Sequence, residues 1–173
     1  MNRSLIYSIF HLFLLIFMLF PGYAYSQAIQ VPINIQTAFF GKIFNHVSPL
    51  NKIQNKKILI VYDTKSESNT NQFIENMTKL GFDMKAVKPD QLVMNIDDYH
   101  VVYFMPGLQE YAKHCRLKKK LSICGVPKYT EQGDISIALG IENDRPQIFL
   151  NIEVLQAEGN DISVELLQIS KVY

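Results

Sequence analysis

Two cysteines are the most reactive side chains of this chain. Cys115 and Cys124 are its only cysteines, and eight residues separate them. The first falls at the end of a short helix expected at 108–116, and the second falls in a strand expected at 121–126. In an oxidising compartment two lone cysteines most simply form a disulfide. Two unpaired thiols, at least one of them buried, are the second interpretation, and a zinc site with His114 is a third that lacks a fourth ligand.

A second group of candidate residues, Asp97, Asp98 and His100, precedes the strand expected at 100–105. Carboxylates beside a histidine suit acid–base or metal chemistry, but general acid–base catalysis needs a pocket and a nucleophile or water. The sequence indicates neither, so a solvated loop is the simpler interpretation. The chain also lacks a nucleophile elbow, a metal-ligand motif and a glycine-rich phosphate loop. We therefore predict no catalytic residue, no metal site and no enzymatic activity.

A hydroxyl-rich loop at 64–70 follows the strongest strand of the chain, 57–63 (KILIVYD), and precedes an amphipathic helix. A helix N-terminus favours anions because its first N–H groups are free, and this segment resembles a flavodoxin phosphate-binding loop. However, the loop has no glycine that would let the backbone wrap a phosphate closely. Asp63 and Glu67 also place negative charge there, and Ser68 is interpreted as a plain helix cap. We therefore predict no bound cofactor.

The order of the expected elements places these residues in an α/β domain. Apolar runs predict buried parallel strands at 57–63 and 100–105, with a short strand at 83–87 between them. Helical patterns separate the strands, and such β-α-β-α-β units are joined by right-handed crossovers. A β-hairpin is expected at 135–150. The predicted fold is a single three-layer α/β sandwich whose mainly parallel sheet carries this hairpin at one edge.

An apolar stripe runs along the helix expected at 33–47. Apolar residues recur at every fourth position, and further phenylalanines widen the stripe. Packing against the sheet is the first interpretation. Because a helix on a sheet buries about one face, an aromatic face left at the surface is the alternative, and exposed aromatic residues often anchor interfaces. We therefore predict Phe39, Phe40 and Phe44 as the candidate partner interface.

Residues 1–26 have the pattern of a secretory signal peptide. Arg3 is their only charge, an almost wholly apolar run spans 5–20, and Ala24-Tyr25-Ser26 fits the small-x-small cleavage rule. A retained N-terminal anchor is the alternative, because the apolar run is close to the minimum span of a bilayer. We predict cleavage after Ser26, a mature domain at 27–173 and a periplasmic location.

The charge of the mature chain is balanced. The sequence has 17 basic and 16 acidic residues, and Arg3 leaves with the signal peptide. Such a domain has no overall electrostatic attraction to nucleic acid, so no nucleic-acid partner is predicted. The basic run at 116–120 is expected to be a solvated edge, and contact with an acidic partner or lipid headgroups is the alternative.

Residues 133–172 form a complete closing segment for such a domain. After the hairpin, Asn151 stands where a helix N-cap is needed, and the helix that begins at Ile152 is stopped by Gly159. A last amphipathic helix is expected at 163–172. Its acidic first turn and basic last turn both suit the helix dipole.

These residues resemble the C-terminal signature of the YfiR-like family. The resemblance is clear over about residues 133–172, and it is looser but collinear from about Ile33. The first helix of the family often runs into a Trp-Pro pair, whereas this chain has Val47-Ser48-Pro49, so any role of that tryptophan does not carry over. The matching positions of the signature, none of them catalytic, are Gly133, Ile135, Ile148, Phe149, Asn151, Ser163, Leu166, Leu167 and Ser170.

The resemblance implies a small, non-enzymatic periplasmic regulator. The best-known YfiR-like proteins bind the periplasmic sensor part of an inner-membrane diguanylate cyclase and hold it inactive, which lowers cyclic di-GMP output and biofilm formation. We therefore expect an interaction protein, acting as a homodimer, that restrains a membrane diguanylate cyclase or a histidine kinase. Disulfides are common in the family, which agrees with a bond between Cys115 and Cys124, although no pairing is carried over. The alternative is a small-ligand module resembling one lobe of a periplasmic solute-binding protein.

Overall fold

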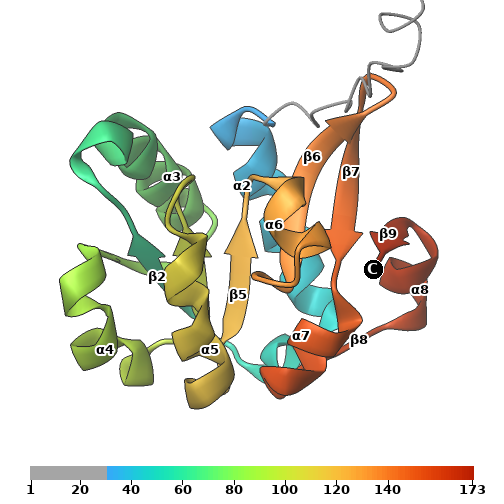
Figure 1. Ribbon diagram of the computed structural model, residues 1–173. Helices are drawn as coiled ribbons and strands as arrows, with labels where there is room; N and C mark the ends of the chain where they lie inside the picture. The colour runs from blue at the N-terminus through green and yellow to red at the C-terminus, as the bar shows by residue number, and fades with distance from the viewer. Residues whose placement is uncertain (1–30) are drawn as a thin grey trace, which may run out of the picture.

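A seven-stranded sheet forms the centre of the described part of the chain (Figure 1). The computed structural model describes residues 31–173, so the predicted signal peptide at 1–26 lies outside the described residues. In spatial order the strands are β3 (Asp83–Val87), β2 (Lys57–Val61), β4 (Val101–Phe104), β5 (Leu121–Cys124), β6 (Ile137–Glu142), β7 (Arg145–Leu150) and β9 (Ser170–Val172).

Every neighbouring pair in this sheet is parallel except β6–β7, which is the predicted hairpin. The hairpin lies near one end of the sheet, and the three-residue strand β9 pairs with β7 to complete that edge. The predicted three-layer α/β sandwich with a mainly parallel sheet is therefore confirmed.

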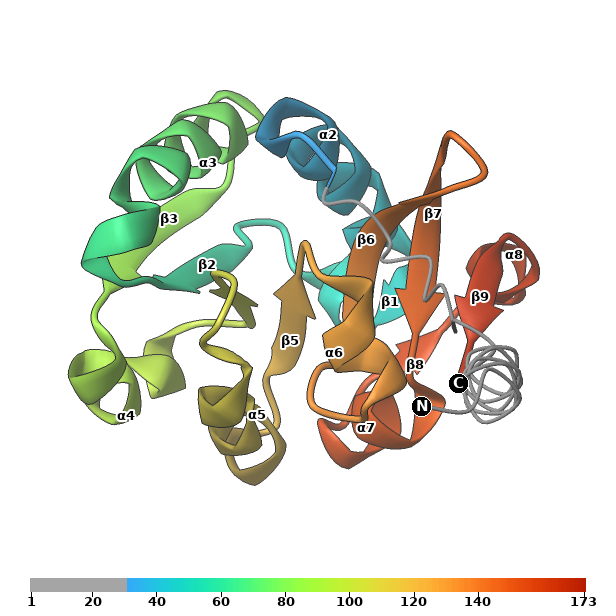
Figure 2. The same cartoon turned by 45° about the horizontal axis from the view of Figure 1, so that its top comes forward.

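Helices cover both faces of the sheet, as Figure 2 shows. The longest described helices, α2 (Ile33–Ile43) and α3 (Glu67–Lys79), lie side by side on one face. Shorter helices cover the other face: α4 (Leu92–Asn95), α5 (Lys113–Lys118), α6 (Pro127–Glu131) and α7 (Ile152–Ala157). Helix α8 (Val164–Gln168) lies at the sheet edge and leads into β9.

Short elements complete the chain. A two-stranded antiparallel sheet joins β1 (Val47–Ser48) to β8 (Asp161–Ile162), and it ties the segment after α2 to the C-terminal part. Single turns of 3₁₀-helix lie between the main elements at η1 (Phe44–His46), η2 (Leu50–Lys52), η3 (Thr64–Ser66), η4 (Pro89–Gln91), η5 (Ile96–Asp98) and η6 (Gln109–Ala112).

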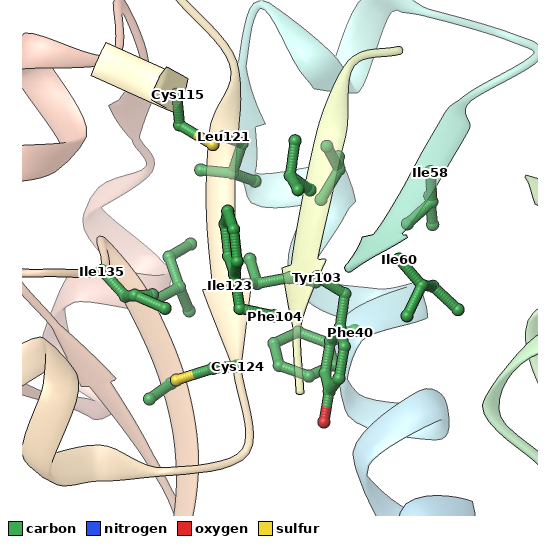
Figure 3. Close-up of a cluster of buried hydrophobic side chains, with 14 of the residues drawn as sticks. Phe40, Ile58, Ile60, Tyr103, Phe104, Cys115, Leu121, Ile123, Cys124 and Ile135 are labelled. Carbon is green, nitrogen blue, oxygen red and sulfur yellow. The ribbon is translucent and has the colours of Figure 1, made fainter. Parts of the chain in front are cut away.

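The core includes residues from the helices on both faces of the sheet, and its aromatic part lies where α2 and α3 meet the central strands. All four residues of β4 and of β5 are buried, because helices cover both faces of these parallel strands. The ring of Tyr103 on β4 lies 4.1 Å from that of Phe73 on α3 and 6.0 Å from that of Phe40 on α2, measured between centroids. Figure 3 shows Phe40 beside Tyr103, with the apolar side chains of β2 and β5 around them. These aromatic contacts fix the packing of both long helices on the sheet.

Several local predictions are confirmed at single residues. The side chain of Asn151 accepts a hydrogen bond of 3.0 Å from the Val154 N–H, as an N-cap does. Gly159 has a φ of 76°, so it provides the left-handed residue that follows α7. Strand β3 spans the residues that were expected to form it.

Three local features differ from the prediction. The last helix, expected at 163–172, ends at Gln168, because the open edge of β7 offers backbone partners to the following residues. Pro127 begins helix α6 instead of only ending the preceding strand. The predicted cap Ser68 lies inside α3, and Asp63 with Ser66 forms the capping box of the turn that precedes this helix.

Candidate functional site

The predicted aromatic interface on α2 is wrong for two of its three residues. Phe40 and Phe44 are fully buried, and only Phe39 is partly exposed. Phe40 packs on Phe44 at 6.2 Å between ring centroids, and Phe44 meets the ring of Phe82 edge-on at 5.6 Å. Helix α2 is covered by α3 as well as by the sheet, so it buries more than one face. Phe40 and Phe44 are therefore core residues and offer no anchor to a partner.

The predicted disulfide between Cys115 and Cys124 is also wrong: both cysteines are free, and both are buried. The carbonyl of Cys115 accepts a hydrogen bond from the N–H of Lys120, just before β5 begins, whereas Cys124 ends that strand. Four residues of extended chain span about 13 Å, and a disulfide needs Cα atoms within about 7 Å. Figure 3 shows the two thiols at opposite ends of β5. The sequence distance was short enough for closure, but the direction of the strand separates the thiols.

The environment of both thiols disfavours the thiolate form. Burial and the nearby charge of Glu158 raise the pKa of Cys115 well above its usual value. Burial raises the pKa of Cys124 to about 12. Because the thiolate is the nucleophile, neither cysteine suits catalysis near neutral pH.

In a doubly wound sheet of this strand order, ligands bind beyond the carboxyl ends of the strands, and the order reverses between β2 and β4. Here Gln36 from α2 fills part of this edge. Its Oε1 accepts a hydrogen bond of 2.7 Å from the Tyr103 hydroxyl, and its Nε2 donates one of 2.6 Å to the Val31 carbonyl. A Cβ on Gly125 would lie only 2.5 Å from that Oε1. The side chain is therefore tightly enclosed, and it closes the edge above β4 and β5.

A shallow polar depression remains beside this closed region. It has a volume of about 300 Å³ and lies between the first turns of α2 and α3. Its lining residues are Val31, Pro32, Ile33, Asn34, Asn69 and Gln72. The amide groups of this lining offer hydrogen bonds, but the depression brings together no nucleophile, base or charged pair.

In the loop after β2, the carboxylate of Asp63 lies where a bound anion would otherwise be expected. Asp63 accepts hydrogen bonds from the N–H and the hydroxyl of Ser66, at 2.9 Å and 2.7 Å. The hydrogen bonds from Ser66 hold the pKa of Asp63 below its usual value. The carboxylate thus occupies the position near the start of α3 where a phosphate would bind.

The charged residues near β4 form structural contacts. Asp97 pairs with Lys118 at 2.7 Å, and Nδ1 of His100 accepts a hydrogen bond of 3.0 Å from the Lys57 N–H. Burial lowers the pKa of His100. Between residues 31 and 173, no group of three His, Cys, Asp or Glu side chains is placed to hold a metal ion.

Most cations of the basic run at 116–120 are bound by the chain itself. Arg116 donates to the carbonyls of Gly133 and Asp134 at 3.1 Å and 3.3 Å. Lys120 donates to the carbonyl of Asp97 at 2.8 Å, and Lys119 donates to that of Ala157 at 2.7 Å. The run therefore joins α5 to its neighbours instead of forming a free basic patch.

Of the nine large apolar side chains that are exposed among residues 31–173, five lie in the last ten residues. We call this group the C-terminal apolar surface; it consists of Val164, Leu167, Ile169, Val172 and Tyr173, all exposed on α8, on β9 or at their ends. Figure 1 shows α8 and β9 at one side of the molecule, away from the helices that cover the sheet. Sequence reasoning placed these residues in one amphipathic helix, so it missed the surface. The signal available was the apolar content of 164–173 itself.

A buried carboxyl group was missed as well. Glu158 follows the last turn of α7 and is fully buried. Its Oε2 accepts hydrogen bonds from the Ser122 N–H at 2.9 Å and from the Ser136 hydroxyl at 2.7 Å. Burial raises its pKa to about 7, although these hydrogen bonds act in the opposite direction. In the sequence, Glu158 is only a polar residue before a glycine.

Comparisons with known proteins support the fold alone. No family model matches the sequence, and no curated protein matches it. A solved structure described as the ABC domain in complex with L-Trp from Streptococcus pneumonia is similar over 82% of this chain, with a TM-score of 0.61 and 13% identity. A conserved domain protein from Vibrio cholerae O1 biovar El Tor has a TM-score of 0.64 and 12% identity over the same share. This chain covers 60% of each of those chains.

No helix within residues 31–173 is long and apolar enough to cross a bilayer.

Proposed function

We propose that this protein is a non-enzymatic, exported regulator that binds and restrains the periplasmic part of a membrane signalling enzyme. The observation that carries the proposal is the C-terminal apolar surface. Five large apolar side chains are exposed within ten residues, and grouped exposed apolar residues often mark a protein contact region, whereas single ones need no explanation. The YfiR-like resemblance covers the same segment. It points to a diguanylate cyclase or a histidine kinase as the restrained enzyme.

Protein atoms fill the space at the carboxyl ends of β4 and β5, which supports binding through a surface instead of through a pocket. In this fold a small ligand would bind at the carboxyl ends of the strands, but the enclosed side chain of Gln36 fills the edge above β4 and β5. The remaining depression is polar and shallow. The exposed apolar side chains at the end of the chain therefore suit a protein partner better than this depression suits a buried ligand.

An exposed residue of the C-terminal apolar surface tests the proposal. Ile169 is 65% exposed on this surface, and Leu117 on α5 is 74% exposed elsewhere. We expect Ile169→Glu to raise cyclic di-GMP, or the output of the restrained kinase, to the level of a deletion strain. Leu117→Glu is the matched control and should leave output unchanged. Circular dichroism of both variants should match that of the wild type, because neither side chain is part of the core.

Binding is measured directly with the same pair of variants. The periplasmic domains of candidate cyclases and kinases are purified, and their affinity for the wild type is determined by titration. Loss of affinity in Ile169→Glu, but not in Leu117→Glu, supports the proposal. Equal behaviour of the two variants places the interface elsewhere, and a deletion that changes no output rejects the regulatory function.

A small-ligand module is the second candidate function. It is favoured by the polar depression between α2 and α3 and by the fold shared with a domain whose structure contains L-Trp. Calorimetric titration with L-Trp and other amino acids tests it. Binding that disappears in Gln72→Ala, with unchanged folding, would favour the ligand module over the regulator.

We propose in addition that the regulator is a homodimer, because an open sheet edge beside an apolar surface is suited to pairing with a second copy. Light scattering of the wild type and of Ile169→Glu measures the oligomeric state in the samples used for binding. A monomeric wild type would reject the dimer without rejecting the regulatory function.

A further inference from the structure

A buried carboxyl group fastens the end of the chain to the sheet. We call residues 151–173 the C-terminal module; it comprises α7, β8, α8 and β9. Glu158 extends from the end of α7 to the start of the β5–β6 pair, where its Oε2 accepts the hydrogen bonds of Ser122 and Ser136. The single hydroxyl proton of Ser136 is shared between this Oε2 and the Ser122 carbonyl, which lies 2.7 Å from the Ser136 Oγ. One carboxyl oxygen thus joins three segments of the chain.

The other oxygen of Glu158 has no hydrogen-bond partner among the described residues, although it is buried. A buried carboxylate oxygen without a donor makes the charged form costly, because water would otherwise solvate it. A proton on this oxygen removes the charge and leaves both hydrogen bonds to the other oxygen intact. The geometry therefore favours the neutral acid in the closed structure.

The groups around Glu158 do not cancel its charge by direct contact. On α5, the Cys115 thiol is neutral, and the guanidinium of Arg116 donates to two backbone carbonyls instead of to Glu158. Lys119 and Lys120 follow α5 and also donate to carbonyls. Arg116 lowers the pKa of Glu158 from a distance, but burial outweighs it.

We propose that Glu158 is a pH-operated latch that holds the C-terminal module against the sheet when neutral and loosens it when ionised. The pKa of this carboxyl is about 7 in the closed structure, against 4.5 when exposed. A raised pKa means that the closed form binds the proton more tightly than the open form does. Its stabilising contribution is therefore complete below pH 4.5 and is lost as the pH rises through 7.

The latch would regulate the C-terminal apolar surface, because β8, α8 and β9 follow Glu158 directly in the chain. This consequence rests on the proposed function: as the pH rises through neutrality, the surface loses its fixed shape and the partner is released. The latch itself requires no partner. It is a property of the isolated protein.

Hydrogen exchange at two pH values tests the latch. With pKa values of 4.5 and about 7, the opening constant of the C-terminal module should rise roughly 30-fold between pH 5.5 and pH 8. The measurement follows peptides from 152–173 by mass spectrometry, after correction for the intrinsic exchange rate at each pH. Peptides from β2 and β4 provide the internal reference and should change far less.

Two variants of α7 separate the latch from general charge effects. Glu158→Gln keeps an oxygen acceptor for Ser122 and Ser136, but its amide does not titrate. The pH dependence of the opening constant should therefore disappear. Glu153→Gln removes the same charge from an exposed position of the same helix and should behave as the wild type does. His46 also contacts the module, through Ser163 at 3.0 Å. It is unchanged in both variants, so a pH dependence that persists undiminished in Glu158→Gln would mean that Glu158 is not its source and would overturn the latch.

A direct titration keeps the test decisive if Glu158→Gln fails to fold. The side-chain carboxyl carbon of Glu158 is followed by carbon NMR in the wild type, and its midpoint should lie within about one unit of pH 7. A midpoint near 4.5, or exchange in 152–173 that is independent of pH, would overturn the latch. Because no partner is present in these experiments, failure of the latch would leave the regulatory function untouched.

Discussion

Helix α2 and the α8–β9 segment are both rich in large apolar side chains, yet the fold treats them in opposite ways. Phe40 and Phe44 of the α2 region are fully buried, whereas Val164 and Ile169 are each 65% exposed. The difference follows from position: α2 lies between α3 and the middle of the sheet, and α8 lies beyond the last strand. Apolar content alone therefore does not distinguish a core helix from a contact surface. The neighbours of the helix decide between them.

The largest loss of stability is expected for a substitution of Phe40, a buried side chain of α2. Phe40→Ala should lower the free energy of unfolding by about 3–5 kcal/mol, because it leaves a cavity between α2, α3 and β4. Urea unfolding monitored by circular dichroism measures the loss. Phe39→Ala is the matched control on the same helix, and it should cost clearly less because Phe39 is only partly buried. Equal losses would show that the burial of the two side chains differs less than the structure indicates.

A smaller effect is expected where α2 closes the sheet edge. The new Cβ in Gly125→Ala would meet the Gln36 amide, so this variant should lose about 1–3 kcal/mol of stability. Gln36→Ala should also be destabilising, because the buried Tyr103 hydroxyl loses its acceptor. The double variant should lose less than the two single variants combined, since removal of Gln36 makes room for the methyl group. Strict additivity would mean that the two residues are not in contact.

Much of this fold could be predicted from the sequence because its signals are local. The continuous run at 57–61 predicts a strand covered on both faces, and Asn151 predicts a helix start through its own side chain. Alternation of apolar residues with a polar turn was enough for the β6–β7 hairpin. Each of these depends on residues within a few positions of one another.

The closed region around Gln36 and the site of Glu158 could not be predicted because each depends on residues that are distant in the sequence. Gln36 and Tyr103 are 67 positions apart, and Glu158 lies 36 positions from Ser122. Nothing near Glu158 in the sequence indicates burial, and a lone glutamate before a glycine usually faces water. The disulfide prediction failed for a related reason: sequence separation limits how far apart two cysteines lie, but the direction of β5 decides whether they meet.

The smallest change in stability is expected for substitutions in the exposed α8–β9 segment. Val164→Ser combined with Ile169→Ser should change the free energy of unfolding by less than about 0.5 kcal/mol per residue, because neither side chain contributes to the core. The same urea experiment measures it beside Phe40→Ala. A loss well above 1 kcal/mol would mean that another surface covers these residues in solution. Urea unfolding of the wild type at several protein concentrations then distinguishes two explanations. An unfolding midpoint that rises with protein concentration shows that a second copy of the chain buries these residues. A midpoint independent of concentration would instead mean that the rest of this chain buries α8 more deeply than the structure shows, and the C-terminal apolar surface would not be a contact region.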